Sequence, residues 1–237
     1  MISCVSLDFD WTLAEMRPQT YEIYYEVLQE FGYAIDLETI KQRFTEAIDD
    51  LSNSLQEKIL EYARLSPEEQ RELLRTFNYM RLRRLDIESE EELETCLEAI
   101  EKQTQVQQRR VLYEDVQNTL ENLRERNIDL YIISGNTSSR IEGVLRQNGV
   151  FELFREILTP DNCNMLKSEI YSLLPRKTGL SPEMILHCGD HEQDDVEAAN
   201  AHGLQAVLIR RPSHYYQKIA NDAFPVIRGL DELLKFI

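Results

Sequence analysis

The stretch Ile2-Ser3-Cys4-Val5-Ser6-Leu7-Asp8-Phe9-Asp10-Trp11-Thr12 sets the fold of this chain. Residues 2–9 are mostly apolar and carry no helix-starting signal, so they predict a buried strand. Two aspartates and a threonine lie at the point where this strand should end. Because parallel sheets bind ligands at the carboxyl ends of their strands, this stretch also marks the first candidate for a functional site.

Strand and helix patterns alternate after Leu112. Further strands are expected at residues 130–134, 185–189 and 205–209, and helices at residues 115–126, 138–147, 166–174 and 195–202. Alternation of this kind predicts an α/β fold, a Rossmann-like parallel sheet with helices on both faces. We expect residues 1–14 and 112–237 to form this core.

The intervening residues 15–111 have a different character. From about Tyr21 to Gln108 there is no strand pattern, and apolar residues recur at spacings of three and four among Glu, Gln, Leu and Arg. Ser66-Pro67-Glu68-Glu69 carries the signature of a helix start, and Ser89 with Glu92 repeats the same spacing. The sequence therefore predicts about four helices that form an all-helical domain inserted into the core.

Composition narrows the classes of function. The formal net charge of −17 should repel nucleic acid, although local cations can still hold a small anion. No apolar run approaches the roughly 18 residues that a membrane span needs, and the N-terminus shows no secretory signal. The four cysteines form no C-x-x-C pair, and Cys4 and Cys188 lie in apolar runs. We expect a cytoplasmic protein without nucleic-acid or membrane partners, either a monomer or a small homo-oligomer.

Polar residues gather where the predicted strands end. The groups are Asp8 and Asp10, then Ser134-Gly135-Asn136, then Gly189-Asp190 followed by Asp194 and Asp195, with Lys167 opening a helix between the last two. Carboxylates a few ångströms apart repel by about 4 kcal/mol per pair at an effective dielectric near 20. They need a cation or protonation, and an oxygen-rich site with few carboxylates suits Mg²⁺. The segment Arg210-Arg211-Pro212, just beyond another strand end, is expected to be a surface loop.

These residue types suit phosphoryl transfer. Lys167, Ser134 and the Gly135 backbone offer a cation, a hydroxyl and an N–H group to phosphate oxygens. One carboxylate can act as a nucleophile and form an aspartyl-phosphate. A second can protonate the leaving alkoxide and later activate water.

The order of these motifs resembles that of the haloacid dehalogenase superfamily. Asp8-Phe9-Asp10-Trp11-Thr12 is similar to its D-x-D-x-T signature, although the family more often has Gly or Asn where Trp11 stands. Ser134 matches its second motif and Lys167 its third, here without the Pro that often follows. Gly189-Asp190 with Asp194 or Asp195 matches the fourth, and Asp195 is favoured because the residues after it resemble the usual helix start. The insertion lies where the family places its helical C1 cap.

The resemblance implies a role for each matched residue. Asp8 would be the nucleophile and a metal ligand, and Asp10 the general acid and base, which also binds Mg²⁺ through its carbonyl. Asp190 would complete the metal site with support from Asp195 or Asp194. Ser134, Gly135, Asn136 and Lys167 would hold the phosphate. The expected enzyme is a Mg²⁺-dependent phosphatase that hydrolyses small phosphorylated metabolites.

Three other functions remain open. A dehalogenase of the same fold would have no oxygen leaving group to protonate, so Asp10 argues against it. A phosphomutase is compatible with Asp10 and with the cap. A non-catalytic binding module should have lost a nucleophile or a ligand, and none is missing. The sequence does not identify the natural substrate or the cap residues that select it.

Overall fold

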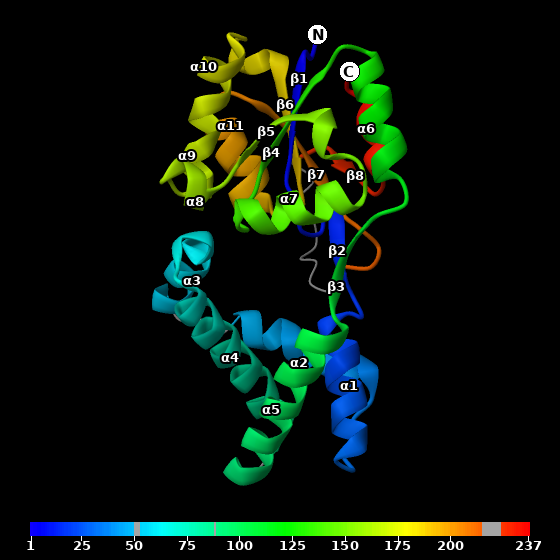
Figure 1. Cartoon of the computed structure of the whole chain (residues 1–237), viewed down its shortest axis with the longest axis vertical. Helices are drawn as coiled ribbons and strands as arrows, with labels where there is room; N and C mark the ends of the chain where they lie inside the picture. The colour runs from blue at the N-terminus through cyan, green and yellow to red at the C-terminus, as the bar shows by residue number, and fades with distance from the viewer. Residues whose placement is uncertain (50–52, 88, 215–223) are drawn as a thin grey trace. The chain divides into compact units, whose positions relative to one another are not determined.

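The computed structural model describes residues 1–49, 53–87, 89–214 and 224–237 (Figure 1). The chain divides into two compact units. The core unit comprises Met1–Glu15, Leu60–Arg64 and Leu112–Ile237, and the insertion unit comprises Met16–Ile59 and Leu65–Val111. The short segment Leu60–Arg64 therefore belongs to the core unit although it lies within the predicted insertion.

The core unit contains a six-stranded sheet. Its strands are β1 (Cys4–Leu7), β4 (Asp129–Ile133), β5 (Phe154–Leu158), β6 (Ile185–Gly189), β7 (Gln205–Ile209) and β8 (Val226–Ile227). The order across the sheet is β5-β4-β1-β6-β7-β8, and every pairing is parallel. This confirms the predicted α/β class, and it places β1 between β4 and β6. The sequence pattern did not predict strands β5 and β8.

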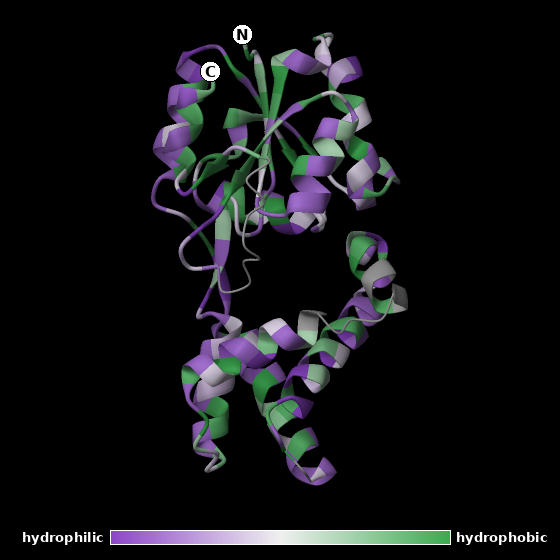
Figure 2. Ribbon diagram, turned by 180° about the vertical axis from the view of Figure 1, so that it is seen from behind, coloured by the Kyte–Doolittle hydropathy of each residue, from purple (hydrophilic) through white to green (hydrophobic). Residues whose placement is uncertain are grey.

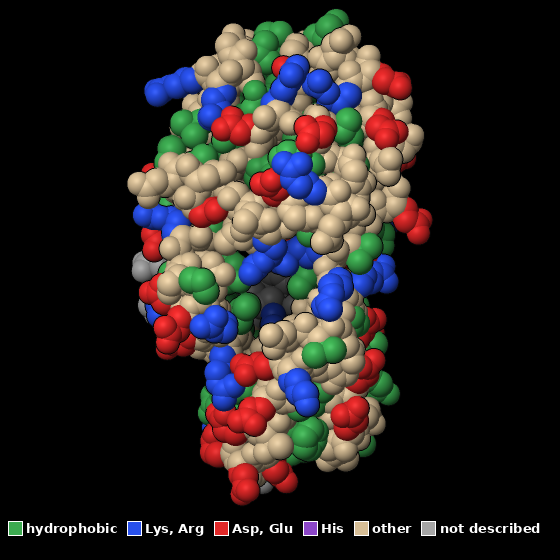
Figure 3. Space-filling view, in the orientation of Figure 1, with side chains coloured by type: hydrophobic (Ala, Val, Ile, Leu, Met, Phe, Trp, Pro, Cys, Tyr) green, Lys and Arg blue, Asp and Glu red, His purple; other side chains and the backbone are tan. Residues whose placement is uncertain are grey.

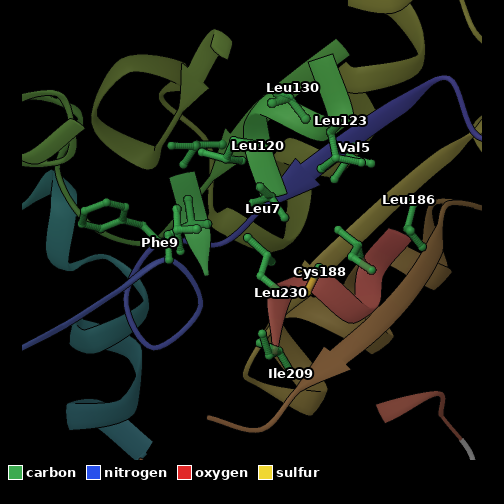
Figure 4. Packing of buried hydrophobic residues seen from close by; sticks show 14 of the residues in the cluster. Val5, Leu7, Phe9, Leu120, Leu123, Leu130, Leu186, Cys188, Ile209 and Leu230 are labelled. Carbon is green, nitrogen blue, oxygen red and sulfur yellow. The ribbon is translucent and has the colours of Figure 1, made fainter. Parts of the chain in front are cut away.

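Successive side chains of the strands point into two apolar layers, one on each face of the sheet. On β1, Val5 and Leu7 face a core that includes residues of α6 (Val116–Glu125) and of the final helical turn η6 (Leu230–Lys235), as Figure 4 shows. Cys4 faces the opposite layer, which contains residues of α9 (Lys167–Ile170) and α11 (Ala198–Ala201). Because a strand directs successive side chains to opposite faces, a sheet covered on both sides must be apolar on both. The hydropathy colouring in Figure 2 shows this concentration of apolar residues in the sheet.

The remaining core helices are short. They are η2 (Phe151–Leu153), α7 (Ser138–Gln147), α8 (Pro160–Cys163), η3 (Tyr171–Leu173), α10 (Leu174–Thr178), η4 (Pro182–Met184) and η5 (Glu192–Glu197). The helix predicted at residues 166–174 is a succession of α9, η3 and α10. The helix predicted at residues 195–202 begins earlier, because a π-helical turn, η5, precedes α11.

The insertion unit is helical, as predicted. Its elements include α1 (Thr20–Glu30), α2 (Leu37–Asp49), α4 (Pro67–Arg83) and α5 (Glu90–Gln107). Helix α3 (Asn53–Leu60) ends where the core-unit segment Leu60–Arg64 begins, and η1 (Tyr62–Arg64) lies within that segment. Among the described residues this gives five α-helices where about four were expected. Ser66 caps α4 as predicted, because its hydroxyl accepts from the Glu69 N–H and the Glu69 carboxylate accepts from the Ser66 N–H.

Two strands connect the units. β2 (Ala14–Arg17) and β3 (Arg109–Leu112) form a two-stranded sheet, and the boundary between the units falls within both strands. Asp and Glu side chains are spread over the surface of the insertion unit, as the space-filling view shows (Figure 3). No helix within the described ranges is long and apolar enough to cross a membrane.

Candidate active site

A buried ion-pair cluster lies at the carboxyl edge of the sheet. Asp8 directly follows β1, is only 4% exposed, and donates its N–H to the Cys188 carbonyl at 2.9 Å. The Lys167 ammonium donates to Asp8 Oδ1 at 2.8 Å and contacts Asp195 Oδ1 at 2.6 Å. The structure thus brings together residues from the first, third and fourth motifs of the sequence.

Asp190 completes this group. One carboxylate oxygen from each of Asp8, Asp190 and Asp195 lies within 4.8 Å of the others. We call these three residues and Lys167 the carboxylate cluster. When all three carboxyls are ionised, three negative charges and one positive charge leave an excess of two negative charges, which a divalent cation would neutralise. Oxygen donors are the ligands that Mg²⁺ prefers, so the residues present fit this ion.

The pKa values of the cluster reflect its burial. Burial raises the pKa of Asp8 to about 7, against the opposing effect of Lys167. Burial, followed by the charges of Asp8 and Asp195, raises the pKa of Asp190 well above its usual value. Burial alone would also raise the pKa of Asp195, but Lys167 and His187 outweigh it and hold that pKa far below the usual range. Asp195 and Lys167 therefore form the stable ion pair, while Asp8 and Asp190 carry the unfavourable charge.

Polar groups around Asp195 hold its carboxylate in place through hydrogen bonds. Its Oδ1 lies 3.1 Å from His187 Nε2 and accepts from the Tyr171 hydroxyl at 3.2 Å, while its Oδ2 accepts from the His191 N–H at 2.9 Å. His187 is fully buried, and its Nδ1 is 2.9 Å from the Ser6 hydroxyl on the neighbouring strand. Every oxygen of Asp195 is thus engaged, which favours a supporting role over direct metal binding.

Gly189 is required for this arrangement. A Cβ at that position would overlap the Asp195 carboxylate, so only glycine lets the carboxylate pass so close to the end of β6. This explains in physical terms why the pair Gly189-Asp190 forms one motif with Asp195. Asp194, the other candidate, is outside the cluster: its carboxylate lies 3.5 Å from the His191 ring, and its backbone carbonyl lies 3.0 Å from the Tyr171 hydroxyl oxygen.

Asp10 lies in a separate hydrogen-bonded group. Its Oδ2 accepts from the Asn136 amide nitrogen at 2.6 Å. The Asn136 carbonyl oxygen accepts from the Thr137 N–H at 2.8 Å and from Arg140 of α7 at 3.2 Å. Asn136, which the sequence predicts to bind phosphate, thus contacts the candidate acid and base in this structure. Arg140 was not singled out from the sequence.

The second motif lies at the end of β4. Ser134 is 2% exposed, and its hydroxyl is 3.4 Å from the Asn136 N–H. A Cβ added at Gly135 would meet no atom within 4 Å, so the space beside its backbone is open. Ser134 and Gly135 thus occupy the sheet edge from which the sequence predicts that they bind phosphate.

Trp11 departs from the family pattern at a position where the backbone conformation matters. Its φ of 60° lies in the left-handed region that favours glycine and asparagine, the residues usual at this position in the family. The Trp11 ring stacks on His214 with centroids 4.3 Å apart, and the His214 Nδ1 lies 3.5 Å from Asp190 Oδ2. This stacking offsets part of the cost of the unusual backbone conformation.

The prediction that Arg210-Arg211-Pro212 is a surface loop was wrong. Arg211 is 3% exposed, donates to the Thr12 carbonyl at 2.7 Å, and pairs with Asp115 at 2.6 Å. Arg210 donates to the Asp190 carbonyl at 2.5 Å and pairs with Glu192 at 2.7 Å. The two arginines fix the loops that carry the first and fourth motifs, because buried guanidinium groups satisfy several backbone and carboxylate oxygens at once.

The fold and the carboxylate cluster define a class of hydrolase, and comparison with known proteins gives the family. Residues 5–209 match the model of the haloacid dehalogenase-like hydrolases, and the chain belongs to that family. It is 29% identical over 208 residues to a phosphoglycolate phosphatase of Synechococcus elongatus, which covers 88% of this chain and 84% of the relative. It is 24% identical over 123 residues to (S)-2-haloacid dehalogenase 2 of a Pseudomonas species, and that match spans only about half of either chain (51% and 53%).

Solved structures share the fold. The HAD-hydrolase YfnB of Bacillus subtilis, solved with bound magnesium, matches with a TM-score of 0.64 at 18% identity, over 99% of this chain and 98% of that one. At this level of identity the likeness concerns the fold. It agrees with the parallel sheet and the helical insertion described above.

Proposed function

We propose that this hydrolase is a Mg²⁺-dependent phosphatase that cleaves small phosphate monoesters through an aspartyl-phosphate on Asp8. The observation that carries the proposal is the carboxylate cluster at the sheet edge, together with Asp10, whose carboxylate accepts a hydrogen bond from Asn136. A buried cluster with two excess negative charges is poorly suited to bind a phosphate by itself. It is well suited to hold a divalent cation that in turn attracts a phosphate.

Each residue has a part in the proposed reaction. Mg²⁺, when bound by Asp8, Asp190 and the Asp10 carbonyl, supplies positive charge to the phosphate. Asp8 attacks phosphorus, and the bond to the leaving oxygen breaks while Asp10 delivers its proton to that oxygen. Asp10 then takes a proton from water as the water cleaves the aspartyl-phosphate. Asp195 and the residues around it hold Lys167 in place beside Asp8.

Lys167, Ser134 and Gly135 are proposed to contact the phosphate oxygens. The Lys167 pKa is well above its usual value, because Asp195 and Asp8 outweigh the effect of burial. It is therefore charged throughout the physiological range. A charged, buried amine at the nucleophile stabilises the additional negative charge of the transition state.

Asp10 favours a phosphatase over a dehalogenase. Displacement of a halide needs no proton at the leaving group, whereas an alkoxide leaves readily only when it is protonated. The relatives of this chain include enzymes of both kinds, so the two activities must be tested side by side. The decisive assay measures phosphate release from a panel of phosphorylated metabolites with Mg²⁺, and halide release from 2-haloacids.

Phosphoglycolate belongs in this panel because the relative in Synechococcus is named for it. Sugar phosphates, nucleoside monophosphates and one folded phosphoprotein complete it. We infer that the insertion acts as a cap that restricts access to small substrates, so kcat/KM should be higher for metabolites than for the phosphoprotein. Halide release without phosphate release would reject the phosphatase, and a preference for the phosphoprotein would reject the cap's proposed role.

A further inference from the structure

One hydrogen-bonded chain in the core unit reaches from the candidate general acid to a residue that the family's motifs do not include. The Asn136 amide donates to Asp10 Oδ2 at 2.6 Å, and Arg140 Nη1 donates to the Asn136 carbonyl oxygen at 3.2 Å. The same nitrogen donates to the Tyr62 hydroxyl at 3.2 Å. Tyr62 lies in Leu60–Arg64, the part of the insertion that belongs to the core unit.

We propose that Arg140 is a positioning residue that acts through Asn136 on the general acid Asp10, an inference that rests on the proposed phosphatase function. The Asn136 carbonyl oxygen receives two donors, the Thr137 N–H and Arg140. An amide whose oxygen is held in this way must turn its NH₂ group toward Asp10. The positive charge of Arg140 also polarises the amide and strengthens its bond to the carboxylate.

This arrangement distinguishes the two carboxylate oxygens of Asp10. Because Oδ2 accepts a hydrogen bond from Asn136, Oδ1 is the oxygen to which we assign the proton transfer. In the first step Asp8 forms a bond to phosphorus, the bond to the leaving oxygen breaks, and the Oδ1 proton passes to that oxygen. Rotation of the Asp10 carboxyl would move this proton out of line, and the Asn136–Arg140 pair prevents that rotation.

The neutral partners of Arg140 support a role in positioning. Arg140 is half-buried at the start of α7, and among the residues that the structure describes it has no carboxylate partner. Its guanidinium carbon lies 5.9 Å from the centre of the Tyr62 ring. Arg146, on the same helix, is exposed and pairs with Glu142 and Glu152 in the ordinary way. Arg140 is thus placed to orient neutral groups next to the site.

The leaving group tests this role. An alkyl phosphate, such as glycerol phosphate, needs a proton on its departing oxygen, whereas 2,4-dinitrophenyl phosphate releases a stable anion that needs none. Both lack a carboxylate that could pair with Arg140 directly. Because kcat/KM reports the step in which the leaving group departs, it is measured for both substrates in the wild type and in Arg140→Gln, with Arg146→Gln as the matched control.

We expect Arg140→Gln to lower kcat/KM for the alkyl phosphate by about tenfold or more and for the aryl phosphate by less than about threefold. Arg140→Lys should restore part of the loss, because one donor to Asn136 returns. Arg146→Gln should leave both values unchanged. An equal loss on both substrates, or no loss on the alkyl phosphate, would overturn the proposal.

A double variant identifies the route of the effect. If Arg140 acts through Asn136, then Arg140→Gln combined with Asn136→Ala should be no worse than Asn136→Ala alone, within about twofold. Losses that multiply would show that Arg140 acts independently of Asn136, which contradicts the proposal. A wild type that hydrolyses neither ester would instead refute the phosphatase function itself, a result that differs from either outcome with the variants.

Discussion

The charged networks of the two units differ in their exposure to solvent and in their balance of charge. In the insertion unit, Arg75 of α4 pairs with Glu94 and Glu101 of α5, and all three side chains are between 35% and 49% exposed. In the core unit, the side chains of Asp8 and Asp195 are 6% and 0% exposed, and the cluster has more carboxylates than cations. Solvent hydrates the charges of the surface network, so these ion pairs cost little free energy to form and stabilise the fold only weakly. Burial removes that hydration from the carboxylate cluster, so its charges destabilise the fold unless a cation binds.

The comparison indicates which charges serve folding and which serve chemistry. Three buried carboxylates around one lysine are unfavourable when all are ionised, so their presence points to a ligand that balances their charge. The surface network needs no such explanation, since each carboxylate there lies beside a guanidinium and water. Five experiments follow from this contrast, beginning with the largest expected effect.

Asp8→Asn should lower turnover of phosphate esters on the order of 10⁴-fold or more, because an amide cannot attack phosphorus. Circular dichroism and the melting temperature should show an intact fold, since one buried negative charge has been removed from a crowded site. The matched control is Glu94→Gln in the surface network, which should leave turnover unchanged. Turnover of Asp8→Asn within tenfold of wild type would exclude Asp8 as the nucleophile.

Removal of divalent metal should abolish activity, and Mg²⁺ should restore it. Ca²⁺ should support less than about a tenth of the Mg²⁺ rate, because the larger ion takes more ligands and engages both oxygens of the Asp8 carboxylate. Thermal melts provide a second measurement: Mg²⁺ should raise the melting temperature of the wild type but not that of Asp190→Asn. Full activity in excess chelator would contradict the metal requirement.

Lys167→Met should destabilise the fold by several kcal/mol, on the order of 3–5, because it leaves Asp8 and Asp195 buried without their cation. Chemical denaturation without metal measures this change. Lys177→Met is the matched control, because that lysine pairs with Glu156 at 2.9 Å and is 36% exposed. Equal effects of the two substitutions would show that the carboxylate cluster is not energetically distinct from the surface.

In the metal-free protein, Asp8 and Asp190 should lower the stability as the pH rises from about 4 to about 7. His187 and His214 have lowered pKa values and oppose this change, so the measurement compares wild type with a variant of one carboxyl. Asp8 has a folded pKa near 7, and the pKa of Asp190 is also raised, so over this range these two carboxyls hold protons in the folded state that they release in the unfolded chain. Stability therefore falls with rising pH wherever the folded state binds more protons. Asp190→Asn removes one of these groups. Its melting temperature should exceed that of metal-free wild type by about 3 °C or more at pH 7, and the gap should narrow toward pH 4.

The site residues at the edge of the sheet could be predicted from the sequence more fully than the contacts that surround them. Asp8, Asp10 and Asp190 were predicted to converge because the carboxyl ends of parallel strands meet at one edge of the sheet, a rule that needs no side-chain detail. Lys167 opens a helix, and only its place in the series of motifs assigned it to the site. The pairing of Ser6 with His187 depends on strand register, which local patterns do not specify.

Contacts between residues far apart in the sequence also could not be predicted from local patterns. Tyr62 meets Arg140 across 78 positions, and Arg211 meets Thr12 across 199. A basic dipeptide after a strand normally indicates a solvated loop, and only the packed structure shows that Arg211 is buried. The unusual conformation of Trp11 has a similar origin, since the turn geometry decides its φ and the residue type would not suggest it.

The smallest effect is expected in the surface network. Arg75→Gln removes the charge that faces both Glu94 and Glu101, yet it should lower the free energy of unfolding by only about 1 kcal/mol or less. These side chains are partly hydrated already, and ordering them costs entropy that offsets the attraction. The difference between wild type and variant should disappear at about 1 M salt, where the screening length is near 3 Å. In Lys167→Met the loss should persist at that salt concentration, because ions do not enter a buried site. A salt-insensitive loss in Arg75→Gln would show that the insertion also depends on a shielded ion pair, and the proposed contrast between the two units would then be wrong.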